Sequence, residues 1–244
     1  MIDKVFIGPV CLLRGYQLLF SKGLKRYIII PALINTLFFM LALWIGFHWV
    51  GRLSGLLPHY LHFLKFFFDI VCFLAMSILF AYIFTTLTNL IGAPFNSFLS
   101  AKMDRMIDPK HAPIESKGLL FESYRTLKRE GQKMIYYLPR LVGVLILFFI
   151  PGVNVIASGV WFLFIAWVMA IEYLDYPIDN RKENFESTRT FVKRHFAACF
   201  GFGITVSIAA MIPIVNFVIV PAAVIGGTNL SRQISPQREV IVQS

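Results

Sequence analysis

The residues best suited to bind an anion lie at positions 21–26, where Ser, Lys, Gly, Leu, Lys and Arg precede a long apolar segment. Gly23 allows a tight turn, and the first N–H groups of the following helix are unpaired at the positive end of its dipole. With two cations beside them, these groups predict an oxyanion site at Gly23, Leu24, Lys25 and Arg26. The alternative is that the cations only flank a membrane helix on its cytoplasmic side.

Two further polar residues follow a Gly-Ala-Pro sequence at positions 92–94, where we expect a helix to break. Polar groups beside a broken helix at membrane depth line water or substrate. Asn96 and Arg105 are therefore candidates for pore-lining residues. For Arg105 the alternative is an ordinary surface charge beside Asp104 and Asp108.

The sequence holds no Walker phosphate loop, no Gly-x-Ser-x-Gly elbow and no His-Glu-x-x-His motif. We therefore expect no catalytic residues, no enzymatic activity, no use of ATP and no cofactor. His59 and His62, with His48 nearby, have spacing that a metal site can use, but histidines at a membrane interface more often contact water, so no metal site is predicted. Three scattered Cys, at positions 11, 72 and 199, are expected to be apolar fillers.

The composition indicates which elements must hold these residues. Of 244 residues, 57% are hydrophobic and 15% are charged, whereas soluble domains carry roughly 25% charged residues. The net charge of +10 comes from Lys and Arg that lie between apolar segments, so it argues for membrane lipids and small anions as partners, and against nucleic acid. The chain is predicted to be an all-α integral membrane protein.

Segment lengths give its organisation, since about 20 helical residues cross a hydrocarbon core of roughly 30 Å. Residues 27–50 and 70–91 predict two long transmembrane helices. Residues 141–171 and 196–225 are long for one crossing and short for two, and each is interrupted by Ile-Pro-x-Val-Asn. Half-helices of about 10 to 16 residues would reach about 15–24 Å, so we predict two half-inserted helical hairpins. The shared interruption also suggests an internal repeat, against the alternative of chance similarity.

The distribution of Lys and Arg favours the same topology. They are concentrated in residues 1–26, 92–140 and 172–195, and hairpins would place all three segments on the cytoplasmic face. Residues 172–195 are expected to be a cytoplasmic loop within a single membrane domain, 1–230, and the polar tail 231–244 is expected to be disordered.

Two segments have the pattern of interfacial amphipathic helices. In residues 116–138, apolar residues recur every three to four positions and basic residues, including Arg125, Arg129 and Lys133, occupy the remainder. Residues 3–20 show a weaker version of this pattern, so residues 1–26 are predicted to be an interfacial helix followed by the anion-binding turn. We expect both helices to lie at the lipid surface.

Several short motifs resemble the CysZ sulfate permease family. They occur in order over nearly the whole chain: Gly-Leu-Lys-Arg at 23–26, Gly-Ala-Pro-Phe-Asn at 92–96, Tyr-Leu-Asp-Tyr-Pro at 173–177, Pro-Ile-Val-Asn at 213–216, Pro-Ala-Ala-Val at 221–224 and Gly-Gly-Thr at 226–228. The resemblance implies a multi-pass protein of the bacterial inner membrane that takes up sulfate for cysteine biosynthesis, without ATP, as a homo-oligomer.

The resemblance also implies that a Gly-Leu-Arg stretch binds sulfate, which corresponds to Gly23, Leu24, Lys25 and Arg26. Lys25 stands where the family has its first Arg, and a Lys is a point charge without the planar, two-pronged geometry of Arg. Bidentate binding would then come from Arg26. The alternative function is a membrane adaptor that binds anionic lipid or cytoplasmic sulfur-assimilation partners without transport.

Overall fold

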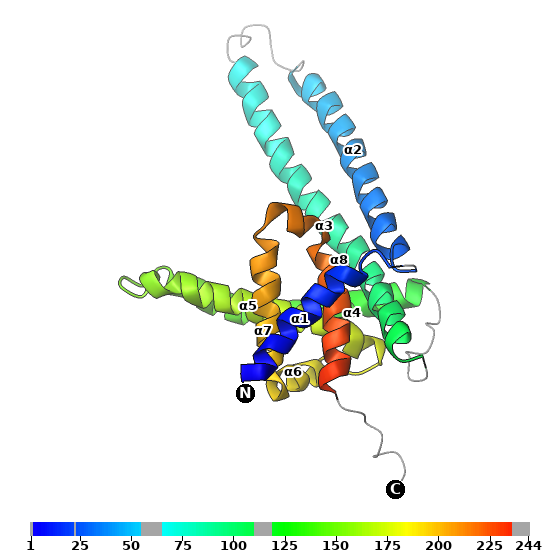
Figure 1. The fold of residues 1–244 in the computed structure, drawn as a ribbon. Helices are drawn as coiled ribbons and strands as arrows, with labels where there is room; N and C mark the ends of the chain where they lie inside the picture. The colour runs from blue at the N-terminus through cyan, green and yellow to red at the C-terminus, as the bar shows by residue number, and fades with distance from the viewer. Residues whose placement is uncertain (1, 22, 55–64, 110–118, 236–244) are drawn as a thin grey trace. The chain divides into compact units, whose positions relative to one another are not determined.

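The computed structural model describes residues 2–21, 23–54, 65–109 and 119–235. Throughout these ranges the regular structure is α-helical, as predicted (Figure 1). The helices are α1 (Ile2–Leu18), α2 (Arg26–Ser54), α3 (Lys65–Ile107), α4 (Leu119–Leu147), α5 (Asn154–Asn180), α6 (Phe185–Arg194), α7 (Phe196–Ala210) and α8 (Pro213–Ile234). The chain divides into two compact units, one of residues 28–93 and one of residues 1–27 with 94–244. Lys22, His59, His62 and the last nine residues of the tail lie outside the described ranges.

The unit of residues 28–93 contains most of α2 and the first part of α3, and both predicted transmembrane segments are helical there. The apolar stretch Arg26–Gly46 is long enough to cross a membrane, and 0% of it is buried. Large side chains such as Leu37 and Ile78 are about 70% exposed on these helices. A surface of this kind is stable in contact with lipid, since lipid tails solvate apolar side chains as water does not.

Helix α3 differs from its prediction, because it continues without a break through the Gly-Ala-Pro sequence at 92–94 to Ile107. A proline inside a helix removes one backbone hydrogen bond and favours a bend, but the rest of the ladder can continue on both sides. The predicted break at Pro94 is therefore wrong. Asn96 and Arg105 project from a regular helix and do not follow a loop.

At the first interruption, residues 150–154, the chain turns between α4 and α5, and these two helices with their turn are called hairpin 1 below. Gly152 has a φ of +83°, in the left-handed region that glycine adopts without strain. The second, at residues 212–216, joins α7 to α8 in hairpin 2. Ile212 is extended, as expected for a residue before proline, and Pro213 begins α8 where its missing N–H costs no intrahelical bond. The two hairpins point in different directions (Figure 1).

The arms of hairpin 1 are longer than the predicted 10 to 16 residues. Helix α4 has 29 residues and α5 has 27, because both continue from the apolar turn into polar sequence. The predicted loop 172–195 is accordingly mostly helical, since α5 ends only at Asn180 and α6 occupies Phe185–Arg194. Asn184 caps α6 by accepting a hydrogen bond of 2.8 Å from the Ser187 backbone N–H, a local signal that the charge count overlooked. Helix α8 also extends into the predicted tail, to Ile234.

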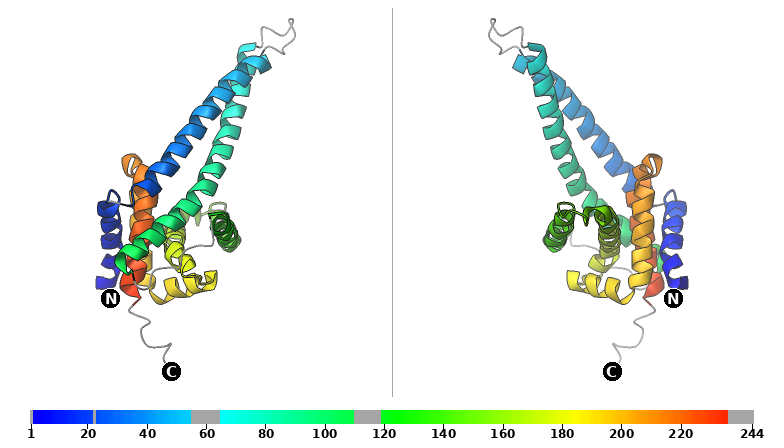
Figure 2. Two further views of the ribbon diagram at one scale, coloured as in Figure 1. Left: turned by 90° about the vertical axis from the view of Figure 1, so that its right-hand side faces the viewer. Right: turned by 90° about the vertical axis from the view of Figure 1, so that its left-hand side faces the viewer.

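The core of the larger unit is formed where α1, α5, α7 and α8 pack together, and both views of Figure 2 show α1 beside hairpin 2. Its fully buried side chains include Leu12, Leu174, Phe202 and Val224. Small residues permit the close approach: a Cβ on Gly203 of α7 would lie 2.0 Å from the backbone oxygen of Ala166 in α5. The helix predicted over residues 3–20 is observed as α1 and ends at Leu18, and one face of it is covered by protein.

Two of the three cysteines, Cys11 and Cys199, are fully buried in this core, which agrees with their prediction as apolar fillers. The Cys11 thiol donates to Gln233 Oε1 at 3.2 Å. Burial raises the pKa of Cys11 to about 11, an effect only partly offset by the charge of Arg14.

Candidate functional site

The predicted anion site forms a tight turn between α1 and α2. Gly23 has a φ of +98°, and the Leu24 backbone N–H donates to the Ser21 carbonyl at 3.3 Å. Leu24 is fully buried and anchors the turn in the core, while its carbonyl accepts from the Tyr27 N–H at 3.0 Å. The sequence therefore produces the geometry expected of it: a glycine turn that ends directly at the start of α2.

The two cations of this turn face solvent. Lys25 and Arg26 are exposed, and the Arg26 guanidinium lies over the neighbouring Tyr27 ring, with its Cζ 4.8 Å from the ring centroid and Nη2 donating to the phenol oxygen at 3.0 Å. In the described part of the chain, neither cation forms an ion pair with a carboxylate. Their positive charge is therefore available to an anion from solution.

A third cation, Lys102 of α3, reaches the same turn and was not predicted. Its Cε lies 3.7 Å from the position that a Cβ on Gly23 would occupy. Lys102 is partly exposed, and within the described ranges it has no ion-pair partner. No local pattern around position 102 indicates this contact, because Lys102 and Gly23 are far apart in the sequence. The turn thus collects three cations: Lys25, Arg26 and Lys102.

The two predicted pore-lining residues do not share a surface. Asn96 and Arg105 are nine residues apart on one continuous helix, which is two and a half turns, so they lie on opposite sides of α3. Asn96 is half-buried, with its amide 3.5 Å from the Tyr176 phenol oxygen of α5, and Arg105 is partly exposed. A single path along one face of α3 cannot include both.

A different stripe of α3 is buried and polar. Ser97 donates to Asn180 at 2.7 Å, Ser100 bonds Thr228 of α8 at 2.8 Å, and Asp104 is held by Arg232 of α8, whose Nη2 donates at 3.0 Å. Asp104 is fully buried and also lies 3.7 Å from Arg181 Nη2. The spacing of 97, 100 and 104 places these side chains on one helix face, a periodic signal that the sequence does contain. The alternative for Arg105, an ordinary surface charge, stays a prediction, although its neighbour Asp104 is buried.

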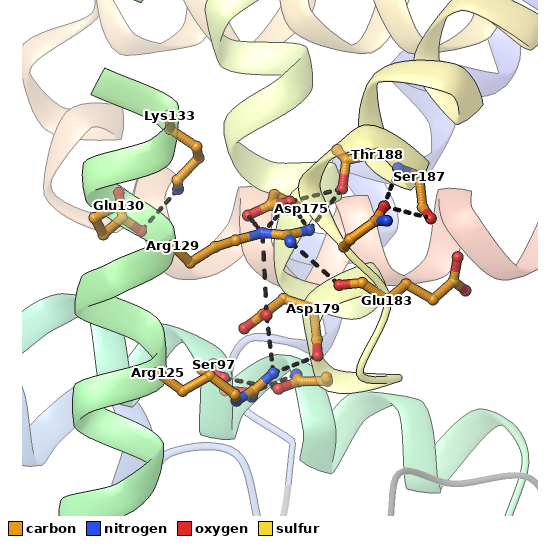
Figure 3. Close-up of polar contacts among 12 residues, drawn as sticks. Ser97, Arg125, Arg129, Glu130, Lys133, Asp175, Asp179, Glu183, Ser187 and Thr188 are labelled. Atoms are coloured by element: carbon orange, nitrogen blue, oxygen red, sulfur yellow. Dashed lines mark hydrogen bonds and ion pairs between the residues drawn. The ribbon is translucent and has the colours of Figure 1, made fainter. Parts of the chain in front are cut away.

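The strongest polar arrangement lies between α4 and α5, where three cations meet three carboxylates. Figure 3 shows two of these pairs, Arg125 with Asp179 and Arg129 with Asp175. Arg125 pairs with Asp179 at 2.8 Å, Arg129 with Asp175 at 2.7 Å, and Lys133 with Glu172 at 2.8 Å. The cations are four residues apart and the carboxylates three or four apart, so each set forms a row on its helix. We call these six residues the ion-pair cluster.

The ion-pair cluster is satisfied by further hydrogen bonds. Asp175 accepts from three groups: Arg129 Nε at 3.1 Å, Arg129 Nη2 at 2.7 Å and the Thr188 hydroxyl at 2.6 Å (Figure 3). Part of the basic face of the predicted amphipathic helix is therefore turned toward protein and not toward solvent. Its basic side chains Arg129 and Lys133 are 7% and 1% exposed, while apolar Ile135 is 76% exposed.

Burial and neighbouring charges shift the pKa values of two residues in this region, Lys133 and Glu130. Burial disfavours a charged Lys133, but Glu172 and the neighbouring carboxylates outweigh it and raise the Lys133 pKa. Glu130, which accepts from Lys133 at 2.7 Å, has its pKa raised to about 7 by burial and by the charge of Glu172. Lys133 therefore stays charged, and its charge is balanced by the carboxylates around it.

Comparisons with known proteins agree with this architecture. A family model described as "Sulfate transporter CysZ/Etoposide-induced protein 2.4" matches residues 11–221. A "Sulfate transporter CysZ" of Pseudomonas aeruginosa is 39% identical over 229 residues, which cover 91% of this chain and 92% of the relative. Proteins of the same name from Pectobacterium atrosepticum and Salmonella typhimurium are 37% and 36% identical, over 93% and 88% of this chain and 85% and 87% of their own lengths. The match includes the glycine turn, the buried stripe of α3 and the ion-pair cluster, and the chain belongs to the family of the sulfate transporter CysZ and etoposide-induced protein 2.4.

Proposed function

We propose that this protein is a sulfate permease of the bacterial inner membrane, which moves sulfate without ATP and supplies it for cysteine biosynthesis. Relatives over nearly the full length are named as sulfate transporters, and this is the main support for the substrate. The observation that supports a binding site in this chain is the convergence of Lys25, Arg26 and Lys102 on the Gly23 turn without a neutralising carboxylate in the described ranges. The adaptor alternative receives no comparable support.

The turn can bind a tetrahedral dianion in three ways. The backbone N–H groups at the start of α2 offer donors at the positive end of a helix dipole. Arg26 offers a planar guanidinium that can donate two parallel hydrogen bonds, while Lys25 and Lys102 add point charges. Charge-assisted hydrogen bonds contribute about 1.5–3 kcal/mol each, so two or three of them give a site that captures sulfate and still releases it.

The membrane arrangement that we propose is a multi-pass one, with α2 and the first part of α3 as transmembrane helices and the two hairpins inserted part of the way. For hairpin 1, partial insertion is supported by the short apolar end of its first helix, α4. Only Leu141–Leu147 of α4 follow the last charged residue, Arg140, before the turn. Seven helical residues reach about 10 Å, a third of the hydrocarbon core. Around the turn, Phe149 and Val155 are more than 80% exposed, as expected for side chains in lipid.

We also propose a homo-oligomer, in which copies of the chain together line the conduction path. The buried polar groups of α3, α5 and α8 in this single chain are already occupied by one another. A continuous route for a hydrated dianion would then lie between copies. Because Asn96 and Arg105 are on opposite sides of α3, they would line this route only from different copies, one copy contributing Asn96 and another Arg105.

The decisive experiment is sulfate flux into liposomes that contain the purified full-length chain. We expect uptake of labelled sulfate above that of empty vesicles, without ATP. The variant K25Q/R26Q should bind sulfate at least about tenfold more weakly, since it loses interactions of about 1.5–3 kcal/mol each. The matched control is K193Q/R194Q, because Lys193 and Arg194 are the same dipeptide, exposed at the end of α6. Equal uptake by empty and loaded vesicles would contradict the proposal.

A further inference from the structure

Two arginines from different helices meet at the ring of Tyr136. The Arg140 guanidinium carbon, one turn further along α4, lies 3.8 Å from the centroid of this ring. The corresponding carbon of Arg189, from α6, lies 4.4 Å from it. The two guanidinium carbons can therefore be no farther apart than the sum of these distances. Like charges at this separation repel each other unless an anion joins them.

No carboxylate of the described chain compensates these two charges. Neither Arg140 nor Arg189 takes part in an ion pair within the described ranges, whereas Arg125, Arg129, Arg181 and Arg232 all face an aspartate there. The Arg189 Nε is buried and has no hydrogen-bond partner, and the same holds for the neighbouring Tyr137 hydroxyl. A cation–π contact uses the face of a guanidinium group and leaves its N–H donors free. Arg140 Nη1 donates to the Tyr136 backbone carbonyl, while the other donors of Arg140 and the buried Arg189 Nε remain available to an anion.

The location of the pair indicates where an anion would come from. Arg140 is the last charged residue of α4 before the apolar turn of hairpin 1, and the pair is surrounded by aromatic rings: Trp167 lies 5.6 Å and Phe185 5.4 Å from Tyr136. Aromatic and basic side chains gather in this way at the level of the phospholipid headgroups. The phosphates of those headgroups would be within reach of both arginines.

We propose that Arg140, Arg189 and Tyr136 form a second oxyanion site, distinct from the Gly23 turn, which binds a tetrahedral phosphate or sulfate group at the base of hairpin 1. A phosphate that accepts hydrogen bonds of roughly 2.7–2.9 Å from two guanidinium groups fits a separation within the limit set above. The bound group anchors hairpin 1 at a fixed depth, because α4 and α6 each hold it by one arginine.

The test measures ligand-induced shifts of the thermal midpoint for the full chain in nonionic detergent. One arm adds phosphatidylglycerol or, for comparison, phosphatidylcholine. A second arm adds sodium sulfate to the variant K25Q/R26Q, so that the Gly23 turn no longer contributes. Each arm compares R140Q/R189Q with the control K193Q/R194Q, which removes two exposed charges from the same α6 helix. R140Q alone provides a variant at an exposed side chain, where folding is not at risk.

We expect phosphatidylglycerol to raise the midpoint of the wild type and of K193Q/R194Q, R140Q to lose part of this shift, and R140Q/R189Q to lose all of it. If only the sulfate response in the K25Q/R26Q background depends on Arg140 and Arg189, the site is supported with a free anion as its source. If neither response changes in R140Q/R189Q or R140Q, the proposal is overturned, while flux dependent on Lys25 and Arg26 would stand unaffected.

Discussion

Individual cations in this chain fall into two groups according to their partners. Those of the ion-pair cluster are buried and face a carboxylate, so their charge is used within the protein. Those at the Gly23 turn are at least partly exposed and have no carboxylate partner in the described ranges. The sequence alone cannot make this distinction, because both groups consist of Lys and Arg near apolar segments and differ only in long-range contacts. Two predictions distinguish the buried, paired cations from the exposed ones.

Removing Lys102 should weaken sulfate binding without unfolding the chain. The substitution K102Q removes one of three charges beside Gly23, so we expect the dissociation constant for sulfate to rise roughly five- to thirtyfold, as for the loss of about 1–2 kcal/mol. Isothermal titration with sulfate checks this, with K128Q as the control, since Lys128 is exposed on α4. Unchanged binding by K102Q would exclude Lys102 from the site, whatever K25Q/R26Q shows.

Removing Arg129 should have the opposite profile, with a large loss of stability. The substitution R129A leaves Asp175 buried without its principal partner, and breaking a buried ion pair in this way costs about 3–5 kcal/mol. Denaturant unfolding in detergent measures the change in free energy. The double variant R129M/D175L, which leaves no uncompensated charge, should recover a large part of the loss. A change below about 1 kcal/mol for R129A would mean that the ion pair is not formed.

At the scale of helices, the apolar pattern of the sequence predicts which segments are helical. It predicts less accurately at which residues each helix ends and which of its faces is buried. The turns of both hairpins were found because proline and its neighbours interrupt apolar runs. The break at Pro94 was not confirmed, because a single proline removes one hydrogen bond while the flanking turns persist. Helix α4 was predicted to be a surface helix with its basic residues facing solvent, but Arg129 and Lys133 are buried against the carboxylates of α5 while Ile135 is exposed.

Packing of α5 against α7 should depend on the absence of a side chain at Gly203. The substitution G203V would place a Cβ 2.0 Å from the Ala166 carbonyl oxygen, so the helices must separate, and we expect a loss of at least about 2 kcal/mol. The thermal midpoint in detergent checks this. A suitable control is G159A, because a Cβ at Gly159 of α5 meets nothing within 4 Å, and the better helix propensity of alanine should leave stability unchanged or slightly higher.

For the molecule as a whole, composition and segment length were sufficient to predict a helical membrane protein, and the motifs were sufficient to predict its family. The side-chain contacts that form the sites could not be predicted from composition, segment length or motifs. Arg129 and Asp175 are 46 residues apart, and Lys102 approaches Gly23 only through the fold. Their pairing follows from how α3, α4 and α5 pack, which no local pattern encodes.

The proposed depth of hairpin 1 gives a prediction on this scale. In a Cys72→Ser background, Phe149→Cys at the apolar turn should react poorly with a membrane-impermeant maleimide from both sides of the membrane, because lipid surrounds it. Lys128→Cys, at an exposed position of α4, should react from the cytoplasmic side only. Efficient labelling of Phe149→Cys from the periplasmic side would mean that hairpin 1 crosses the membrane completely.

The buried positions of Cys11 and Cys199 bear on such experiments. Both sulfur atoms are enclosed by protein, and a thiol with a pKa near 11, as at Cys11, holds almost none of the reactive thiolate at neutral pH. Alkylating reagents should therefore leave these two residues untouched in the folded protein. Any inhibition of the wild type by a thiol reagent would report on Cys72 alone, and the two native core cysteines can be retained as an internal gauge of unfolding.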